Sequence, residues 1–212
     1  MKRGIKTFHY ITIFPNLILP YFAEALLHRA EKAKLIKKHT VQLRDFADDE
    51  RGTVDGVPYG GGPGMVLKPE PIYKAVQSIK KKAKGKTRVI LFSTRGKKFT
   101  NVEAKRFATY SHIVFICGRY EGVDERVAEH IADEEISMGD FVLAGGELPA
   151  LTVTEAIVRH IPGVLGKYES LEEIKGSYPT YTRPPVFKKW EVPEVLQNED
   201  HKKIEEWRKN KK

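Results

Sequence analysis

The segment HIVFICGRYEGVDER, from His112 to Arg126, joins an apolar strand to a glycine-containing turn and the start of a helix. The near-continuous apolar run of residues 112–117 is typical of a parallel strand that is buried on both faces. Ligands of open α/β sheets bind beside the carboxyl ends of strands, so we expect Gly118, Tyr120 and Glu121 to lie beside a ligand. The dense charge that follows could instead form helix caps or a structural ion-pair cluster.

Strand-like and helix-like segments alternate around this motif. Strands are predicted at residues 6–14, 40–46, 87–93 and 112–117, with short extended pieces at 135–138 and 141–143. Helices are predicted at residues 21–34, 70–82, 100–110, 124–131, 147–160 and 201–209. Thr100 and Glu103 have the spacing of a capping box at the start of one of these helices. The alternation predicts an α/β fold with a mostly parallel sheet.

A change of composition near Gly166 predicts the domain organisation. Residues 1–165 carry the alternating pattern and are expected to form the main domain. Residues 166–177 are polar and are expected to form a linker. Residues 178–212 are rich in proline, end in a basic helix and are expected to form a small C-terminal domain.

Composition narrows the class of protein. The 212 residues include 37 Lys and Arg against 28 Asp and Glu, a net charge of +9 that weakly favours a polyanionic partner such as RNA or DNA. The single cysteine, Cys117, excludes an intramolecular disulfide and any zinc site made of several cysteines. No window approaches the ~20 apolar residues of a membrane span, and no run resembles a signal peptide, so we expect a cytoplasmic protein.

Two further segments are rich in glycine. The first is YGGGPGM at residues 59–65, where three consecutive glycines allow the backbone to approach a ligand closely or to form a flexible surface loop. The second is ISMGDFVLAGGE at residues 136–147, just before a predicted helix. Its two glycine breaks expose backbone N–H and C=O groups that could hydrogen-bond the edge of a purine.

Several common sites find little support in the residues. No GxGxxG motif exists, so a dinucleotide-binding fold is not supported. Residues 85–87 mimic the end of a P-loop, but Lys80 stands where the first glycine belongs. Cys117 fits a small buried residue better than a nucleophile. Trp190 and Trp207 fit packing residues better than platforms for stacking RNA bases.

Taken together, these segments resemble the bacterial tRNA (guanine-N1)-methyltransferases of the SPOUT superfamily over roughly Lys6 to Arg208. The matching blocks are TIFP at residues 12–15, LRDF at 43–46, VDGVPYGGGPGM at 54–65, CGRYEGVDER at 117–126, the glycine pair before Glu147, IPGVLG at 161–166, YPTYTRP at 178–184 and VPEVL at 192–196. So many blocks in the same order make an accidental similarity implausible.

The resemblance implies a fold, a cofactor and partners. The methyltransferase domain would contain a deep C-terminal trefoil knot, an exception to the rule that chains do not thread through loops. The cofactor would be S-adenosylmethionine, and dependence on Mg²⁺ is a trait of the family. The partners would be the anticodon stem-loop of tRNA and a second copy of the chain, with the site built from both copies. The target would be N1 of guanosine 37, on the 3′ side of the anticodon.

The resemblance also implies roles for particular residues. Cofactor binding is expected of Ser93, Gly118, Tyr120, Glu121, Met138, Gly139, Asp140, Phe141, Val142, Leu143, Gly145 and Gly146. Substrate binding is expected of Tyr59, Gly60, Gly61, Gly62 and Arg183. Arg159 matches the family's catalytic arginine, although a basic residue at the end of a helix also suits the helix dipole.

Methylation at N1 needs a base, because guanine keeps its N1 proton at neutral pH. A cation near O6 would stabilise the negative charge that develops as this proton leaves. The family usually carries Glu-Glu-Asp-Ser-Phe in the linker, with the aspartate as base, but here Ile174 stands at the aspartate position. Glu172 or Glu173 could serve instead, since each is a carboxylate on the same segment.

Three other functions remain open on the sequence. A non-catalytic relative could bind S-adenosylmethionine and tRNA without turnover, in agreement with the altered linker. A related enzyme could methylate ribosomal RNA, although the GGGPG block argues against it. A pure RNA-binding module would explain the charge but not the three glycine-rich segments.

Overall fold

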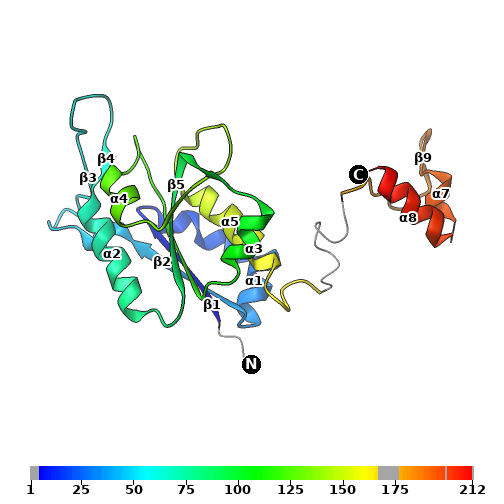
Figure 1. Ribbon diagram of the computed structural model, residues 1–212, viewed down its shortest axis with the longest axis horizontal. Coiled ribbons are helices and arrows are strands. Elements are labelled where there is room, and N and C mark those ends of the chain that lie inside the picture. The colour runs from blue at the N-terminus through cyan, green and yellow to red at the C-terminus, as the bar shows by residue number, and fades with distance from the viewer. Residues whose placement is uncertain (1–4, 167–176, 199, 212) are drawn as a thin grey trace. The chain divides into compact units, whose positions relative to one another are not determined.

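The fold is that of a computed structural model, which describes residues 5–166, 177–198 and 200–211. The chain divides into two compact units, Met1–Val164 and Leu165–Lys212, and each is described here by itself (Figure 1). Every helix in the described ranges is too short or too polar to cross a bilayer.

The first unit is built on a five-stranded sheet with the order β2-β1-β6-β5-β7, in which all paired strands are parallel. The strands are β1 (Lys6–Thr12), β2 (Ile36–Gln42), β5 (Thr87–Lys98), β6 (His112–Ile116) and β7 (Glu134–Ser137). The predicted α/β fold with a mostly parallel sheet is therefore confirmed. The central position of β6 agrees with its apolar sequence, since both of its faces are covered.

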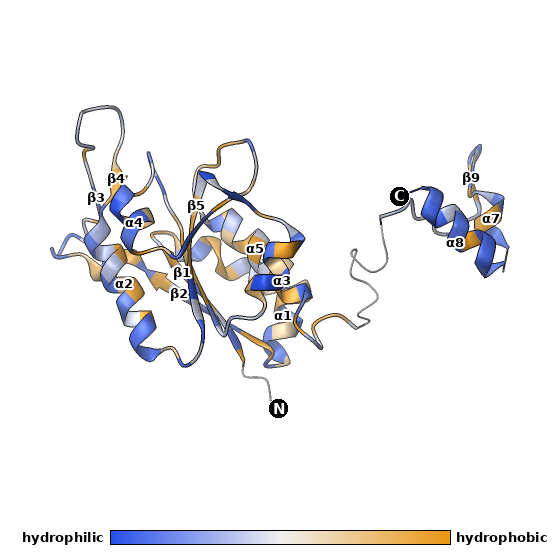
Figure 2. Ribbon diagram, viewed as in Figure 1, coloured by the Kyte–Doolittle hydropathy of each residue, from blue (hydrophilic) through white to orange (hydrophobic). Residues whose placement is uncertain are grey.

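Helices cover both faces of this sheet (Figure 1). One face packs against α1 (Ala25–Lys32), α3 (Asn101–Phe107) and α5 (Glu147–Arg159), and the other against α2 (Pro69–Lys82) and α4 (Glu125–His130). Alternation along β1 explains the two cores, because Phe8 and Tyr10 face the first layer whereas Ile11 faces the second. Figure 2 shows the hydrophobic segments concentrated in the middle of the unit, between the two helix layers.

Short elements explain where two predicted boundaries are wrong. The predicted helix 21–34 starts late, because the 3-10 turns η1 (Pro15–Leu17) and η2 (Leu19–Phe22) come first and Ala25 has a φ of 54°. The predicted strand 40–46 is shifted, because the chain leaves β2 for the 3-10 turn η3 (Leu43–Phe46). The Gln42 side chain accepts a hydrogen bond from Arg44 N and so favours that turn.

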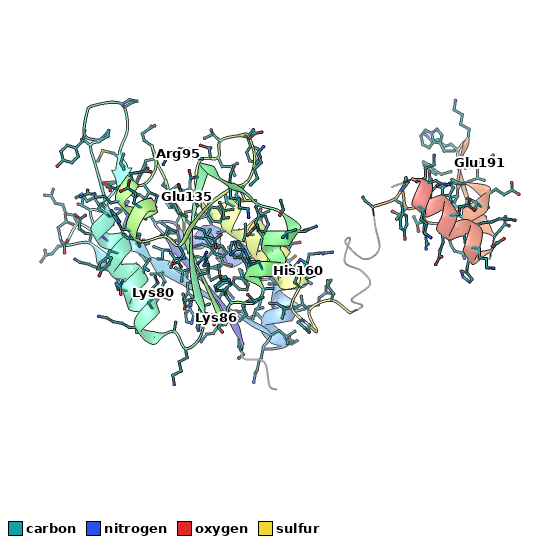
Figure 3. All side chains as sticks on the ribbon, viewed as in Figure 1. Lys80, Lys86, Arg95, Glu135, His160 and Glu191 are labelled. Carbon is teal, nitrogen blue, oxygen red and sulfur yellow. The ribbon has the colours of Figure 1, made fainter. Side chains whose placement is uncertain are left out.

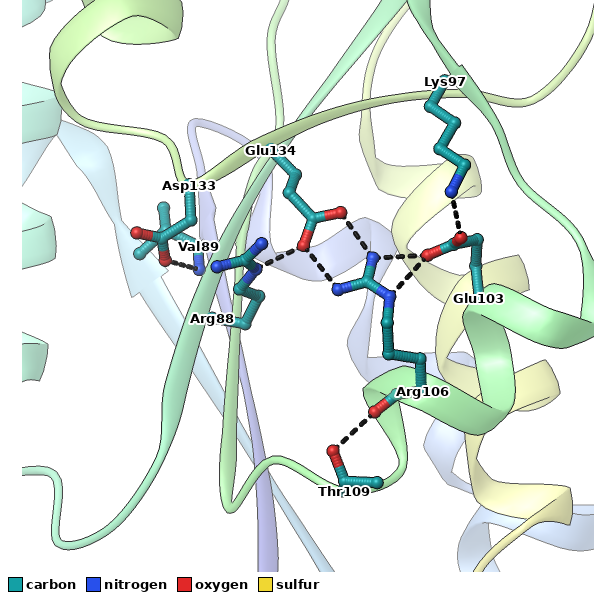
Figure 4. A network of polar contacts seen from close by, with 8 residues as sticks. All are labelled: Arg88, Val89, Lys97, Glu103, Arg106, Thr109, Asp133 and Glu134. Atoms are coloured by element: carbon teal, nitrogen blue, oxygen red, sulfur yellow. Dashed lines mark hydrogen bonds and ion pairs between the residues drawn. The ribbon is translucent and has the colours of Figure 1, made fainter.

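The predicted capping box is also wrong. The Thr100 side chain makes no capping hydrogen bond to the start of α3. The Glu103 carboxylate accepts instead from Lys97 Nζ at 2.5 Å and from Arg106 Nε at 2.8 Å (Figure 4). Arg106 continues the network to Glu134 on β7, with Nη1 to Oε1 at 2.8 Å. Glu103, which the sequence pattern predicted to cap the helix, thus belongs to a network of ion pairs instead.

The edges of the site segments differ from expectation in two places. Strand β5 runs to Lys98, five residues beyond its predicted end at Ser93, because it pairs with β7 a second time after an irregularity. Residues 141–143 form no strand and belong to a loop. A two-stranded antiparallel ribbon, β3 (Asp55–Gly56) and β4 (Val66–Leu67), carries the glycine-rich loop between them.

Within the described residues 177–198 and 200–211, the second unit contains a small hairpin and two helices. They are β8 (Val186–Phe187), β9 (Trp190–Glu191), α7 (Glu194–Gln197) and α8 (His201–Asn210). Trp207 lies with its ring centroid 6.3 Å from that of Tyr181, and Trp190 lies 5.6 Å from Phe187. Both tryptophans therefore contact aromatic neighbours within the unit, as expected of packing residues, although Trp190 is also well exposed.

Candidate active site

A pocket of about 480 Å³ lies at the carboxyl end of the sheet, where the chain leaves β6 and β7 and bulges from β5. Residues of the expected cofactor set that line it are Ser93, Gly118, Tyr120, Glu121, Met138, Gly139, Phe141, Val142, Leu143, Gly145 and Gly146. The pocket therefore brings together three segments that are far apart in the sequence. Asp140 is the member of the set that does not line it, because its carboxylate pairs with Lys98 Nζ at 2.7 Å.

The wall contributed by β5 is an excursion from the sheet. Both Phe92 and Lys97 stand opposite Ile136 of β7, so the residues between them bulge out of the strand. A Cβ on Gly96 would lie 2.6 Å from the Glu135 carbonyl carbon, so only glycine allows the chain to return so close to β7. The bulge presents Ser93 and its neighbours to the pocket.

The floor of the pocket depends on Gly146, at the start of α5. A Cβ there would lie 2.6 Å from Cys117 Cα, and Gly146 N donates to Gly118 O at 3.0 Å. The amino end of α5 therefore rests directly on the backbone at the end of β6. Burial raises the pKa of the Cys117 thiol well above its usual value, so the cysteine is a packing residue here and not a nucleophile.

A buried ion pair supports the same junction. Arg119 Nη2 lies 2.8 Å from Glu147 Oε2, and Glu147 Oε1 accepts from Thr12 Oγ1 at 2.5 Å. The Arg119 guanidinium also lies 4.9 Å from the centroid of the Phe14 ring. A Cβ on Gly145 would clash with the Arg119 side chain. Gly145, the first glycine of the pair, thus leaves room for the arginine that holds the loop.

The alternative roles of the 117–126 segment are divided among its residues. Asp124 accepts from Arg126 N at 3.0 Å and caps α4, as the capping interpretation expected. Gly118, Tyr120 and Glu121 line the pocket, as the ligand interpretation expected. One segment therefore both starts a helix and forms a pocket wall.

The first glycine-rich loop is anchored at its base and open at its tip. Glu121 N donates to Met65 O at 3.0 Å, and Leu67 N donates to Gly122 O at 3.0 Å, so the base of the loop is fixed to the pocket wall. At the tip, Tyr59 is fully exposed. Gly60, Gly61 and Gly62 have φ values of 82°, 80° and 124°, in the region that favours glycine, and a Cβ on any of them would meet no described atom within 4 Å.

The remaining expected residues lie away from this pocket or outside the described residues. Arg159 is in the last turn of α5, about 18 Å along the helix axis from Glu147 at 1.5 Å per residue. Arg183 lines a separate pocket of about 740 Å³ in the second unit. Glu172 and Glu173 lie outside the described residues.

Glu135 and Arg95 are among the pocket residues that the sequence did not assign to the site. Glu135 Oε1 is buried in the wall and forms no hydrogen bond with the described residues, and Arg95 Nη2 lies 4.0 Å from it. Arg95 also pairs with Glu125 at 2.6 Å (Figure 3 labels Arg95 and Glu135). A carboxylate at the start of a predicted extended segment was the available signal, but the sequence could not show that its neighbours leave one oxygen without a hydrogen bond.

Metal binding has no support in the described part of the chain. Within residues 5–166, 177–198 and 200–211, no group of three or more His, Cys, Asp or Glu side chains is placed to hold a metal ion.

Parallel strands and a glycine-lined pocket at their carboxyl ends are typical of an α/β protein that binds a small molecule through backbone loops. The family model described as tRNA (Guanine-1)-methyltransferase TrmD matches residues 6–212. The chain belongs to this family and is a methyltransferase.

Individual relatives agree with this assignment. The tRNA (guanine-N(1)-)-methyltransferase of Bacillus subtilis is 44% identical over 204 residues, which cover 94% of this chain and 84% of that protein. The protein of the same name from Desulfitobacterium hafniense is 46% identical over 207 residues, covering 95% and 78%. A crystal structure of the tRNA (m1G37) methyltransferase from Aquifex aeolicus is 42% identical, with a TM-score of 0.83, and covers 96% of this chain and 88% of that one.

Proposed function

We propose that the protein transfers a methyl group from S-adenosylmethionine to N1 of guanosine 37 in tRNA. The observation that carries the proposal is the pocket, in which the β5 bulge meets two glycine-containing segments in a chain of this methyltransferase family. The three relatives described above are each named as a tRNA methyltransferase, which favours tRNA over ribosomal RNA as the substrate. The non-catalytic relative is a specific outcome of the experiment below.

The pocket fits the proposed cofactor in size and chemistry. Its volume of about 480 Å³ lies within the usual range for sites of small molecules and cofactors. Gly145 and Gly146 line the pocket, so backbone N–H and C=O groups rather than side chains border it at these two positions. The unpaired Glu135 oxygen is an acceptor for a hydroxyl, amine or ammonium donor. When bound, S-adenosylmethionine would supply an electrophilic methyl group.

We also propose that the first unit is knotted. The Gly146 N–Gly118 O bond and the close approach of Gly96 to Glu135 show how tightly these three segments pass one another. The similarity to the Aquifex aeolicus structure, at a TM-score of 0.83, supports a shared path of the chain. The expected trefoil knot would hold the loops in one arrangement without a ligand.

The reaction requires a proton acceptor and a cation for the target guanine. Arg159 is proposed to place its positive charge at O6, where negative charge develops as the N1 proton leaves. Glu172 or Glu173 is proposed to take that proton, in place of the aspartate that the family carries near this point. Substitution of each glutamate by glutamine separates the two, since one change should abolish turnover and the other should not.

The geometry supports a homodimer. Arg159 lies about 18 Å along α5 from the residues at the pocket floor, too far for its side chain to reach the pocket of its own chain. An apolar surface surrounds the first turn of α5 and the η1–η2 turns, with Leu148 64% exposed and Leu17 52% exposed. Such a patch is typical of an interface between subunits. A second copy is therefore proposed to bring its own Arg159 to the site.

The second unit is proposed to bind the anticodon stem-loop, together with the loop of Tyr59 to Gly62. Arg183 lines its pocket beside the exposed Tyr181, a combination that suits phosphates and bases. A requirement for Mg²⁺ and a cytoplasmic location remain predictions. Chelation by EDTA followed by repletion with Mg²⁺ tests the first, and fractionation of cells tests the second.

The test uses a tRNA transcript with guanine at position 37, labelled S-adenosylmethionine and the full chain. Reverse transcription then locates the methyl group, because N1-methylguanine blocks base pairing. A stop at position 37 that disappears when the guanine is replaced by adenine supports the proposal. Cofactor binding without any transfer would identify the non-catalytic relative, and a lack of cofactor binding would favour a pure RNA-binding module.

A further inference from the structure

A cluster of basic residues lies at the amino end of the sheet, opposite the pocket. The run from Lys80 to Lys86 spans the last turn of α2 and the connection to β5. Figure 3 shows Lys80 and Lys86 at the end of the unit opposite Arg95 and Glu135. The exposed side chains in this cluster are Lys37, His39, Lys80, Lys81, Lys82, Lys84 and Lys86. We call this set the amino-edge basic surface.

A chain of contacts connects the two sides of this surface. The Lys84 carbonyl oxygen lies 3.2 Å from His112 Nε2, and His112 Nδ1 lies 3.2 Å from His9 Nε2. His9 stacks in turn on His39, with ring centroids 5.5 Å apart. Burial lowers the pKa of both His9 and His39, and the positive charge of Lys37 adds to the effect. The segment that follows α2 and the exposed edge of β2 are therefore connected across this end of the sheet by a row of three histidines.

The lysines of the run are unpaired. In the described part of the chain, none of the ammonium groups of Lys80, Lys81, Lys82, Lys84 and Lys86 forms an ion pair or a hydrogen bond. Lys38 and Lys74, by contrast, each pair with a carboxylate. Interaction with the helix dipole accounts for basic residues in the last turn of α2. It does not account for Lys84 and Lys86, which follow the helix.

The distance from the pocket decides what could bind there. From Lys86 to Ser93 the strand extends about 23 Å at 3.3 Å per residue. One nucleotide in the pocket cannot reach that far, whereas a folded tRNA continues well beyond the base being modified. Unpaired lysines without a carboxylate partner are also the chemistry that recognises backbone phosphates, through release of counterions.

We infer that the amino-edge basic surface binds phosphates of the same tRNA substrate, at a part of the RNA outside the anticodon stem-loop. The inference rests on the proposed tRNA methyltransferase activity. Such contacts carry no sequence information, but they position the RNA and raise its affinity. This surface should therefore raise the affinity for full-length tRNA, and it should not change the affinity for an isolated anticodon stem-loop.

The test compares two triple variants with equal loss of charge. The first is Lys81→Gln/Lys84→Gln/Lys86→Gln, and the control is Lys32→Gln/Lys74→Gln/Lys105→Gln at exposed positions on α1, α2 and α3. Affinity for full-length tRNA and for the stem-loop is measured from 50 to 300 mM salt. Melting temperature and S-adenosylhomocysteine binding show that each variant is folded.

For full-length tRNA, the first variant should bind about tenfold more weakly near 0.15 M salt, and the slope of log K against log salt should fall by roughly 0.7–0.9 for each lost contact. Its affinity for the stem-loop should match that of the unmodified protein, and the control should change little. An equal loss in the control, an equal loss for the stem-loop, or no loss at all would overturn the inference. Failure of the unmodified protein to methylate either RNA would instead reject the proposed activity.

Discussion

Arg119 and Glu147 join the loop after β6 to the first residue of α5 through a salt bridge of 2.8 Å. The Glu147 side chain is only 2% exposed, and that of Arg119 is 18% exposed. The two residues follow Gly118 and Gly146, whose backbones are hydrogen-bonded to each other. The pocket floor is thus held by one backbone contact and one charged contact side by side.

Breaking this pair should destabilise the first unit. Glu147→Gln leaves the Arg119 guanidinium without its counter-charge, a change that typically costs about 3 kcal/mol or more in a buried pair. Urea denaturation measures the free energy of unfolding. The matched control is Asp48→Asn, which breaks the exposed pair with Lys74 and should cost less than about 1 kcal/mol. Similar losses of unfolding free energy in both variants would show that burial does not make the Arg119–Glu147 pair more important for stability than an exposed pair.

Gly146→Ala should remove cofactor binding while leaving a folded chain. The added Cβ would lie 2.6 Å from Cys117 Cα, so the start of α5 has to move away from the end of β6. Because Gly118 and Gly146 line the same pocket, we expect the affinity for S-adenosylhomocysteine to fall at least about 100-fold, the cost of misplacing a packed backbone. Isothermal titration calorimetry provides the measurement. Gly166→Ala, with nothing within 4 Å of its Cβ, should bind as the unmodified protein does.

The sequence predicted the layers of the fold because the apolar pattern is strong. The run of residues 112–116 became the central strand, and α2 and α5 lie within one residue of their predicted positions. Predictions failed where local signals competed with packing. Glu103 has the spacing of a capping box, yet it pairs with Lys97 and Arg106. Such long-range ion pairs leave no periodic trace in a sequence.

The sequence predicted the glycines of the pocket, but not the side chains and strand pairing that hold its walls in place. Gly118 and Gly146 stand out beside a strand and a helix, and family resemblance assigned them to one site. The unpaired oxygen of Glu135 and the bulge closed by Gly96 depend on the second pairing of β5 with β7. That pairing depends on the tertiary structure. The sequence of residues 93–98 does not specify the register in which β5 pairs with β7 again.

Leu148→Arg should weaken the proposed homodimer. Leu148 is 64% exposed on α5, on the helix face that also carries Glu155, the partner of Tyr21. A charge placed in the middle of an apolar interface remains unpaired and costs several kcal/mol. Sedimentation velocity should show a dimer for the unmodified chain and a monomer for the variant at low micromolar concentration. Val102→Arg, an equally exposed apolar position on α3, should remain dimeric; monomers in both cases would point to a general effect of added charge.

Activity should be shared between subunits if Arg159 acts on the partner's pocket. Arg159→Ala and Gly146→Ala should each abolish methyl transfer, the first without loss of cofactor binding. Co-expression of the two variants should restore about a quarter of the activity, because half of the dimers would contain one complete site of two. The measurement is labelled methyl incorporation into tRNA. No recovery, with mixed dimers verified by two affinity tags, would contradict a site built from both chains.

Stability of the first unit should fall as the pH drops from about 6.5 towards 4. Burial lowers the pKa of His9 from 6.5 to about 4, with the charges of His112, His39 and Lys37 adding to the effect. Between those two values the unfolded chain takes up a proton that the native His9 does not, so unfolding is favoured as pH falls. The difference in the pKa of His9 between the native and unfolded chains lowers the free energy of unfolding by about 3 kcal/mol when the pH has fallen below both values, at 1.36 kcal/mol per pKa unit.

The variant His9→Asn removes this source of pH dependence. Urea denaturation at pH 7.5 and at pH 4.5 should show a smaller difference in unfolding free energy for His9→Asn than for the unmodified protein. His28→Asn changes an exposed histidine on α1 and should leave the difference as it was. An unchanged difference in His9→Asn would mean that other groups cause the loss at low pH. Because His9 lies on the central part of the sheet between β2 and β6, its protonation should loosen all three strands together.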